Sequence, residues 1–507
     1  MKRIALLSCV MLFAARPSAA DDAKSAKVTF RVVGIDGKPL PCRIHLKDAA
    51  GKPVRAAKLP FFRDHFVCPG TATLALFAGA YEYTIERGPE YARVSGAFTV
   101  KDAPIERRVV LKRIDDLAKR GWYGGDLHVH RPVSDVPLLM RAEDLHVAPV
   151  ITWWNNRNLW KDRRPPRQTL VRFDGNRFYD VMAGEDEREG GALLFFGLKT
   201  PLAITGSTRE YPSPMKFVAA ARRHKGVWID VEKPFWWDVP VWLASGRVDS
   251  IGLANNHMCR SRMYEDEAWG RPRDAKRLPS PRGNGYWSQE IYYHILNCGL
   301  RLPPSAGSAS GVLPNPVGYN RVYVHTGAPL TWEKWWAGLL AGRSFVTNGP
   351  LLLCTANGKL PGHVLTSAPD ARSVRVALDL RLRSNDPVPK IEIIQNGRVI
   401  RAIPVADAAS VRVALTFKES GWFLIRAIAA EKRTFRFAST APFYVEIGPQ
   451  KKRISKRSVE FFRGWVEERI KRVPLTLKDE TQLKEVLAHH EAARKFWAKL
   501  RKEANAD

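Results

Sequence analysis

The 507-residue chain is short of negative charge, of cysteine and of long apolar runs beyond its first residues. Its 81 Lys and Arg residues outnumber 51 Asp and Glu residues, which gives a formal net charge of +30. The basic residues are spread along the chain and form no recognisable nucleic-acid-binding motif, so specific nucleic-acid recognition is not expected. The excess charge fits either a basic compartment or attraction to acidic substrates or acidic polysaccharides.

The chain also lacks a candidate transmembrane segment, because no apolar stretch is long enough to span a bilayer. The N-terminus begins Met1-Lys2-Arg3, continues with an apolar stretch over 4–15 and reaches small residues at 18–20. This order is typical of a secretory signal peptide. We therefore expect residues 1–20 to be removed and the mature protein to be exported, to the periplasm or the medium.

Six cysteines are present, and Cys9 falls within the predicted signal peptide. The spacings of the other five match no CxxC zinc pattern. Cys42 and Cys68 fall in one predicted β unit, where an oxidising compartment would permit a disulfide. Two buried thiols are equally compatible with the sequence.

The remaining chain divides into four predicted units. Residues 27–115 contain short alternating strands and turns, which indicate a β-sandwich module. Residues 116–355 alternate short apolar strands with helical stretches, which indicates an α/β fold. Residues 356–447 return to alternating strands, with a hairpin signal at Asn396-Gly397. Residues 448–507 form a basic, amphipathic helical tail, which we expect to pack on the protein rather than bind a membrane or a partner.

The strongest chemical signal lies in the stretch Gly125-Asp126-Leu127-His128-Val129-His130. Residues two apart on a strand point to the same face, so His128 and His130 should project together. Two imidazoles on one face are a natural beginning for a Zn, Mn or Fe site. An exposed His pair without a metal is the alternative interpretation.

Further acids and a histidine follow apolar strand segments elsewhere in the α/β region. In such folds, ligands collect at the carboxyl ends of strands. Each such residue alone is more often structural, but together with the His pair they favour a metal centre. The residues are Glu185, Asp230, Glu232 and His257.

Several motifs of residues 120–355 resemble the PHP superfamily (polymerase and histidinol phosphatase), in its carbaryl-hydrolase-like branch. They are GDLHVH, AGE, EKP, NNH, GLRLPPSAGSASG and AGRSFVTNGPLL, in this order. The resemblance implies a distorted (β/α)7 barrel and metal-dependent hydrolysis of phosphoesters, esters or carbamates. The N-terminal unit resembles carboxypeptidase-regulatory-like modules, which usually accompany a catalytic domain.

The resemblance implies specific metal ligands and also shows that some are missing. The implied ligands for Zn, Mn or Fe are His128, His130, Glu185, Glu232 and His257. Trp153 and Trp154 stand where the family has Asp and His, and Ala309 and Gly311 replace two further ligands. Because Trp and Ala cannot bind a cation, a reduced metal centre is expected.

Two functions follow from this pattern. In the first, a metal activates water for ester or phosphoester hydrolysis, with Asp126, Asp230 or Glu232 handling protons. In the second, a degenerate barrel binds a glycan or another anionic ligand without turnover. Trp153 and Trp154 could then stack on a small-molecule or saccharide substrate. Arg321 could bind an anionic group, or form a structural ion pair. A scaffold role carried by the β units and the tail is a third interpretation.

Overall fold

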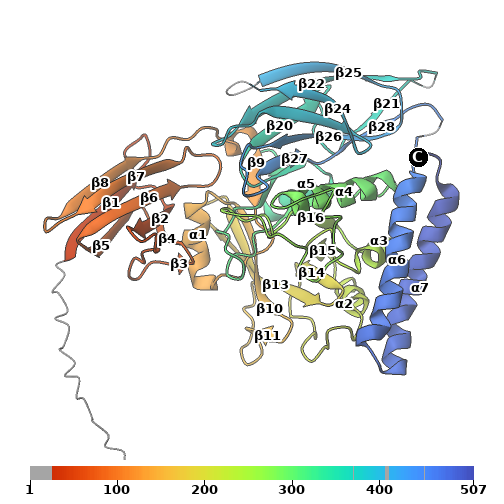
Figure 1. Ribbon diagram of the computed structural model, residues 1–507, viewed down its shortest axis with the longest axis horizontal. Helices are drawn as coiled ribbons and strands as arrows, with labels where there is room; N and C mark the ends of the chain where they lie inside the picture. Colours follow the sequence, from red (N-terminus) through yellow and green to blue (C-terminus); the bar gives the residue numbers. More distant parts are fainter. Residues whose placement is uncertain (1–24, 369, 406–409, 450) are drawn as a thin grey trace, which may run out of the picture.

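The computed structural model describes residues 25–368, 370–405, 410–449 and 451–507. The predicted signal peptide lies outside the described residues. The N-terminal strands form one end of the molecule and a pair of antiparallel helices the other, with a β-rich body between them (Figure 1). Among the described helices, none combines the length and apolar character that crossing a membrane requires.

The N-terminal unit consists of two small sheets packed around one apolar core. One sheet has the order β5-β1-β8, and the other has the order β3-β4-β2-β6-β7. Val28, Phe30 and Val32 alternate along β1 and are fully buried, as the period of a half-buried strand requires. The strands are β1 (Ser25–Val33), β2 (Cys42–Asp48), β3 (Phe61–Phe62), β4 (His65–Cys68), β5 (Thr71–Phe77), β6 (Gly79–Glu86), β7 (Val94–Val100) and β8 (Ile105–Val110).

The two cysteines of this unit lie directly opposite each other. Cys42 on β2 pairs in register with Cys68 on β4, and both are buried free thiols. Burial raises the pKa of the Cys42 thiol well above its usual range. The two side chains therefore pack as part of the core of the unit.

The central region is not the predicted (β/α)7 barrel. Between Trp122 and Thr347, eleven strands alternate with only five α-helices. The strands β9–β10–β13 and β15–β16–β17 pair in parallel, whereas β13–β14–β15 and β9–β18–β19 are antiparallel. A tight connection at Glu189 and Gly190 joins β13 to β14 and reverses the chain without a helix. The fold is thus a large, mixed and mainly β structure.

The elements of the central region follow in chain order. They are β9 (Trp122–Gly125), α1 (Val136–Ala142), β10 (Val147–Trp154), β11 (Arg157–Asn158), β12 (Leu170–Phe173), β13 (Arg177–Arg188), β14 (Gly191–Phe196), α2 (Pro214–Ala221), β15 (Trp228–Val231), α3 (Val239–Ser245), β16 (Ser250–Ala254), α4 (Gly283–Asn297), β17 (Pro304–Ala306), β18 (Arg321–His325), α5 (Trp332–Leu340) and β19 (Ser344–Thr347).

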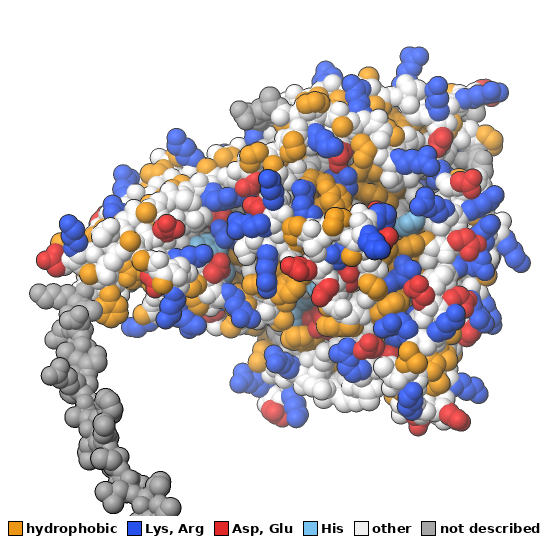
Figure 2. Space-filling model, viewed as in Figure 1, with side chains coloured by type: hydrophobic (Ala, Val, Ile, Leu, Met, Phe, Trp, Pro, Cys, Tyr) orange, Lys and Arg blue, Asp and Glu red, His pale blue; other side chains and the backbone are white. Residues whose placement is uncertain are grey.

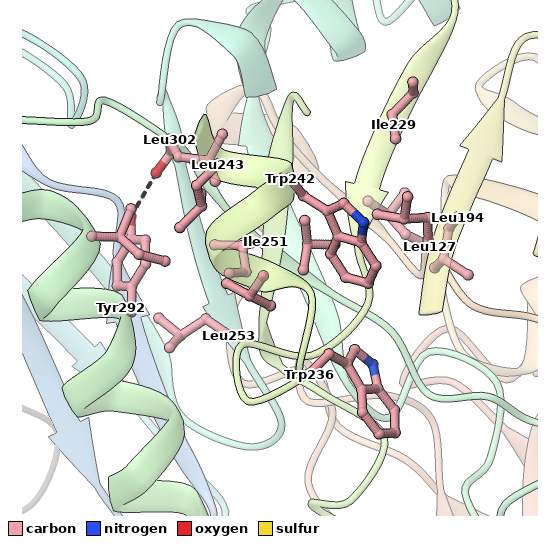
Figure 3. Packing of buried hydrophobic residues seen from close by; sticks show 14 of the residues in the cluster. Leu127, Leu194, Ile229, Trp236, Trp242, Leu243, Ile251, Leu253, Tyr292 and Leu302 are labelled. Carbon is pink, nitrogen blue, oxygen red and sulfur yellow. Dashed lines mark hydrogen bonds between the residues drawn. The ribbon is translucent and has the colours of Figure 1, made fainter. Parts of the chain in front are cut away.

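Large aromatic and aliphatic side chains fill the space between the central strands and helices (Figure 3). Trp242 of α3 and Trp236, just before this helix, are fully buried in the same apolar cluster as the strand residues Ile229 and Ile251. The hydroxyl of Tyr292 on α4 donates to the carbonyl of Leu302, 2.9 Å away. Burying side chains of this size supplies most of the local stability, at about 1.5–3 kcal/mol for each large apolar group.

The C-terminal β region contains two layers of strands around a second apolar core. Asn396 and Gly397 both have positive φ and join β23 to β24 in a tight hairpin, as their sequence indicates. The strands are β20 (Leu351–Ala356), β21 (Val364–Thr366), β22 (Val374–Arg383), β23 (Lys390–Gln395), β24 (Arg398–Pro404), β25 (Ser410–Phe417), β26 (Gly421–Ile428), β27 (Phe437–Thr440) and β28 (Phe443–Glu446).

The tail forms two long helices, α6 (Lys456–Thr476) and α7 (Glu480–Glu503), which pack against each other and against α3. The side chain of Asp479 caps α7 by accepting from the backbone N–H of Gln482. Trp497 is fully buried, and its indole N–H donates to the carbonyl of Pro240 at 3.0 Å. Lys and Arg side chains are distributed over the visible face of the whole molecule, with acidic residues among them (Figure 2).

Candidate metal centre

The His128-Val129-His130 segment lies extended between β10 and the loop that follows β17. The N–H of Leu127 donates to the carbonyl of Ala306, and the N–H of His130 donates to that of Ser310. Val129 forms parallel bridges to both sides, to Val150 and to Ser310. This extended backbone turns both imidazoles to one side, where their Nε2 atoms lie 2.9 Å apart.

Glu185 on β13 completes a compact group with the two histidines. Its Oε2 lies 3.4 Å from His128 Nε2 and 3.2 Å from His130 Nε2. The Glu185 side chain is buried, and no group of residues 25–368, 370–405, 410–449 or 451–507 forms a hydrogen bond of ordinary geometry with its Oε2. One carboxylate oxygen and two imidazole nitrogens thus converge on a small volume, and the three residues could hold a metal ion.

The electrostatics of this group differ between its two histidines. Burial by itself would lower the pKa of His128, but Glu185 and Glu232 reverse this effect and raise it to about 10. Burial lowers the pKa of His130, and the neighbouring His128 adds to that effect. The pKa of Glu185 falls below its usual range, because attraction to the histidines outweighs the effect of burial. The group therefore carries an anionic oxygen beside at least one neutral imidazole.

Glu232 lies on the opposite side of the His128 ring from Glu185. Its Oε1 is 3.4 Å from His128 Nδ1, whereas Glu185 faces His128 Nε2. The other oxygen of Glu232 accepts from Lys233 Nζ and, at 3.0 Å, from the indole N–H of Trp236. Glu232 is therefore placed to orient the imidazole, as carboxylates behind metal-binding histidines do.

His257, a predicted ligand, lies outside the three-residue group. Its ring packs between Phe235 and Tyr264, with ring centroids 5.4 and 5.0 Å away. Burial, with a smaller contribution from Lys233, lowers the pKa of His257 to about 3. Its Nδ1 is buried and has no hydrogen-bond partner within the described ranges of the chain. The structure thus brings together three of the five predicted ligands.

Asp126 serves the backbone around the site. Its Oδ1 accepts from the N–H groups of His128 and Ser308, each at 3.0 Å, and its Oδ2 accepts from the N–H of Gly318 at 2.6 Å. Burial raises the pKa of this carboxyl. Because both oxygens are engaged, Asp126 holds three loops together rather than facing the histidines.

Asp230 lies at the end of β15 and is fully enclosed. Its Oδ1 accepts from the hydroxyls of Ser250 on β16 and Ser305 on β17. Burial raises the pKa of Asp230 to about 7, against the effect of these two hydrogen bonds. Its contacts join β15, β16 and β17.

The two predicted tryptophans of β10 point in different directions. Trp153 is buried in the core, where its indole N–H donates to the carbonyl of Met182 at 3.0 Å. Trp154 lies beside the site, with its ring centroid 4.9 Å from that of His130. The guanidinium of Arg157 lies 5.5 Å from the Trp154 ring centroid. Only Trp154 is therefore placed to contact a ligand at the metal centre.

Arg321, the predicted anion-binding residue, is buried away from the His pair. Its Nε donates to the carbonyl of Gly318 at 2.5 Å, and its Nη1 donates to the carbonyl of Glu143 at 3.1 Å. Its Nη2 lies 3.8 Å from the Glu143 carboxylate and forms no hydrogen bond with any residue that the structure describes. These contacts make Arg321 part of an arginine-rich cluster described below.

The loop at 307–311 approaches the His pair through its backbone. A Cβ at Gly307 would lie 2.5 Å from His128 Cβ, and one at Gly311 would lie 2.6 Å from the carbonyl oxygen of His130. Gly311 also has a φ of +106°, which side chains disfavour. Ala309 is buried and offers no ligand atom. This side of the centre is thus closed by main chain.

Sequence reasoning missed two residues near the site. Glu187 lies two positions beyond Glu185 on β13, and burial with repulsion from Glu185 raises its pKa to about 7. Residues alternate between the two faces of a strand, so Glu187 is expected on the same face as Glu185, opposite the ion pair of Asp186 and Arg188. This alternation could have identified Glu187 from the sequence. Lys233 is buried, pairs with Glu232 and lies 4.4 Å from the ring centroid of Trp236.

A second His and Asp group lies in the N-terminal unit, at His45, Asp64 and His65. Each oxygen of Asp64 already lies close to a ring nitrogen, 3.1 Å from His45 Nδ1 and 2.9 Å from His65 Nδ1. The guanidinium of Arg43 donates to His45 Nε2 at 2.9 Å. An adjacent arginine repels a cation, so the group with Glu185 is the better metal site.

The comparisons with known proteins identify no family. No family model matches the chain, and no curated protein matches it. A match to a solved structure, "The Bacillus anthracis TIE protein", spans 22% of this chain and 20% of that chain, at 20% identity. Its TM-score of 0.15 carries no argument about fold or function.

Proposed function

We propose that this protein is an exported, metal-dependent hydrolase that cleaves an ester or a phosphoester. The observation that carries the proposal is the buried Glu185 Oε2, which lacks a hydrogen-bond partner among the described residues and lies within 3.4 Å of two imidazole nitrogens. A buried carboxylate oxygen without a hydrogen bond is unfavourable, and a cation bound between Glu185 and the two histidines would complete its interactions. The signal-peptide pattern of residues 1–20 supports export.

The residues of the site have distinct parts in this proposal. His128, His130 and Glu185 would hold Zn, Mn or Fe, which supplies Lewis acidity and lowers the pKa of water. Glu232 would keep the proton of His128 on Nδ1, so that Nε2 presents its lone pair. Glu187 would accept the proton from the attacking water, since its raised pKa is near neutral. Trp154 would offer a flat face to the substrate.

Binding without turnover is the second candidate function. It is favoured by the loop at Ala309 and Gly311, which contributes main chain where the resembled family has ligands. In this case Trp154 and the neighbouring Arg157 would bind a glycan or another anionic ligand at the same place.

The test is the metal content of the purified protein, measured by inductively coupled plasma mass spectrometry. We expect about one equivalent of Zn, Mn or Fe in the wild type and loss of it in the double variant His128→Ala/His130→Ala. His363→Ala, which changes an exposed histidine, is the matched control. No metal in the wild type, even after incubation with each ion, would refute the proposal.

Hydrolysis of p-nitrophenyl phosphate and p-nitrophenyl acetate by the metal-loaded protein separates the two functions. Turnover that disappears in the double variant and persists in His363→Ala supports the hydrolase. Stoichiometric metal without turnover on a broad panel of esters and phosphoesters favours the binding protein.

A further inference from the structure

A small cavity lies where the N-terminal unit, the central region and the C-terminal strands meet. Its volume is about 50 Å³, which is enough for several waters, because one water needs about 10–15 Å³. Five arginines line it, from all three parts of the chain: Arg43, Arg93, Arg260, Arg321 and Arg436.

Three carboxylates line the same cavity, and each is shared among the arginines. Glu86 pairs with Arg43, with Arg93 at 2.9 Å and with Arg260 at 2.8 Å. Asp386 pairs with Arg93 at 3.0 Å and with Arg436 at 2.6 Å. Glu143 pairs with Arg43 and lies 3.8 Å from Arg321. Five positive groups thus face three negative ones, which leaves an excess of two positive charges.

The neighbouring acidic residue does not supply the missing charge. Asp144, next in sequence to Glu143, is itself bound by three other arginines, at 2.7–3.1 Å: Arg87, Arg113 and Arg177. The excess is therefore local to the cavity. Arg43, Arg321 and Arg436 are buried, whereas Arg93 and Arg260 are partly exposed. Excess positive charge on the buried arginines is unfavourable unless a counter-ion or a hydrogen-bonding partner is present.

One guanidinium in this cavity has an unused donor. Arg321 is 1% exposed, and its Nη2 has no hydrogen-bond partner in the part of the chain that the structure describes. Gly88 and Gly318, both with positive φ, pack against this guanidinium, and a Cβ at either would lie about 3 Å from it. The backbone thus fixes the arginine in place, with a free N–H at the cavity that it lines.

We propose that this cavity binds a small tetrahedral oxyanion, such as inorganic phosphate or sulfate. The paired N–H donors of an arginine guanidinium match the spacing of two oxygens of such an anion. The excess of two positive charges among the lining residues corresponds to the charge of one divalent anion. The cavity volume excludes nucleotides and other large phosphate esters. The bound anion would connect the three parts of the chain, and the site is independent of the proposed metal chemistry.

Isothermal titration calorimetry of the full chain with phosphate and with sulfate tests the proposal, at constant ionic strength in chloride. We expect one anion per chain and a higher melting temperature in phosphate than in chloride. Arg260→Gln removes one lining charge and should weaken binding at least tenfold. Arg301→Gln, which removes a charge that pairs with Glu446 elsewhere, should leave binding unchanged.

Absence of stoichiometric binding would overturn the proposal, as would equal weakening in both variants, which would indicate a general effect of surface charge. A second measurement covers an Arg260→Gln chain that fails to fold. Crystals of the wild type soaked in selenate should show an anomalous peak within hydrogen-bond distance of Arg321 Nη2. Peaks at other places only would also overturn it.

Discussion

Glu232 Oε1 lies 3.4 Å from Nδ1 of His128, on the side of the ring opposite the nitrogen that faces Glu185. Two carboxylates therefore act on one imidazole from its two ends. One lies within the group that could hold a metal, and the other is placed to fix the tautomer. The sequence predicted both carboxylates as metal ligands, whereas the structure places them at different nitrogens of His128. This difference in position gives the first prediction.

Glu185→Gln and Glu232→Gln should weaken metal binding to different extents. Loss of an orienting carboxylate typically costs about 10–100-fold in metal affinity, so Glu232→Gln should fall in that range. Glu185→Gln removes a direct ligand and should cost more than about 100-fold. Competition with a chromogenic chelator measures both constants. Glu187→Gln is the control and should retain near-wild-type affinity, and an equal loss in the first two variants would make Glu232 a direct ligand.

Metal binding should become tighter as the pH rises. In the metal-free protein His128 carries a proton up to a pKa of about 10, and a metal binds only the neutral ring. Each metal therefore displaces one proton, and the apparent affinity should rise about tenfold per pH unit between pH 6 and 8. Chelator competition across this range tests the slope. A pH-independent constant would show that His128 is already neutral before the metal binds.

Gly184→Ala should destabilise the protein, because the Trp153 ring occupies the space beside Gly184. A Cβ at Gly184 would lie 1.9 Å from that ring. Forcing extra volume into a packed core typically costs about 1–3 kcal/mol. Gly464→Ala in α6 is the matched control, since nothing lies within 4 Å of its added Cβ. It should stabilise by about 0.5–1 kcal/mol through helix propensity. Urea unfolding of both variants checks the opposite signs, and similar midpoints would contradict the packing argument.

Arg469→Met should detach or weaken the helical tail. Arg469 on α6 is 2% exposed and pairs with Asp238 at 2.7 Å and with Glu210 at 2.6 Å. Removing one partner of a buried ion pair costs about 3–5 kcal/mol, because the other charges remain buried. Hydrogen exchange of α6 and α7, together with urea unfolding, measures the loss. Arg463→Met, at a more exposed position of the same helix, is the control and should change the free energy of unfolding little. Equal effects of the two substitutions would show that the buried ion pairs of Arg469 do not stabilise the tail.

Local sequence patterns correctly predicted the features that depend on local geometry. The two-residue period of extended chain placed His128 and His130 on one side, and the same alternation described β1 and β22. The Asn396-Gly397 turn followed from the positive φ that these residues tolerate. Glu185 was found because it follows an apolar strand segment.

Strand pairing and the directions of long side chains depend on contacts between segments that are distant in sequence, so local patterns did not predict them. Short apolar strands and intervening helices suggested a parallel barrel, but strand direction depends on the distant partner, and the β13–β14 connection made it antiparallel. Trp153 and Trp154 are adjacent in sequence, yet the pleat sends one into the core and the other to the site. Arg321 pairs with Glu143, which is far away in sequence. A buried charge is unfavourable unless it is paired, and the fold determines which opposite charge lies close enough.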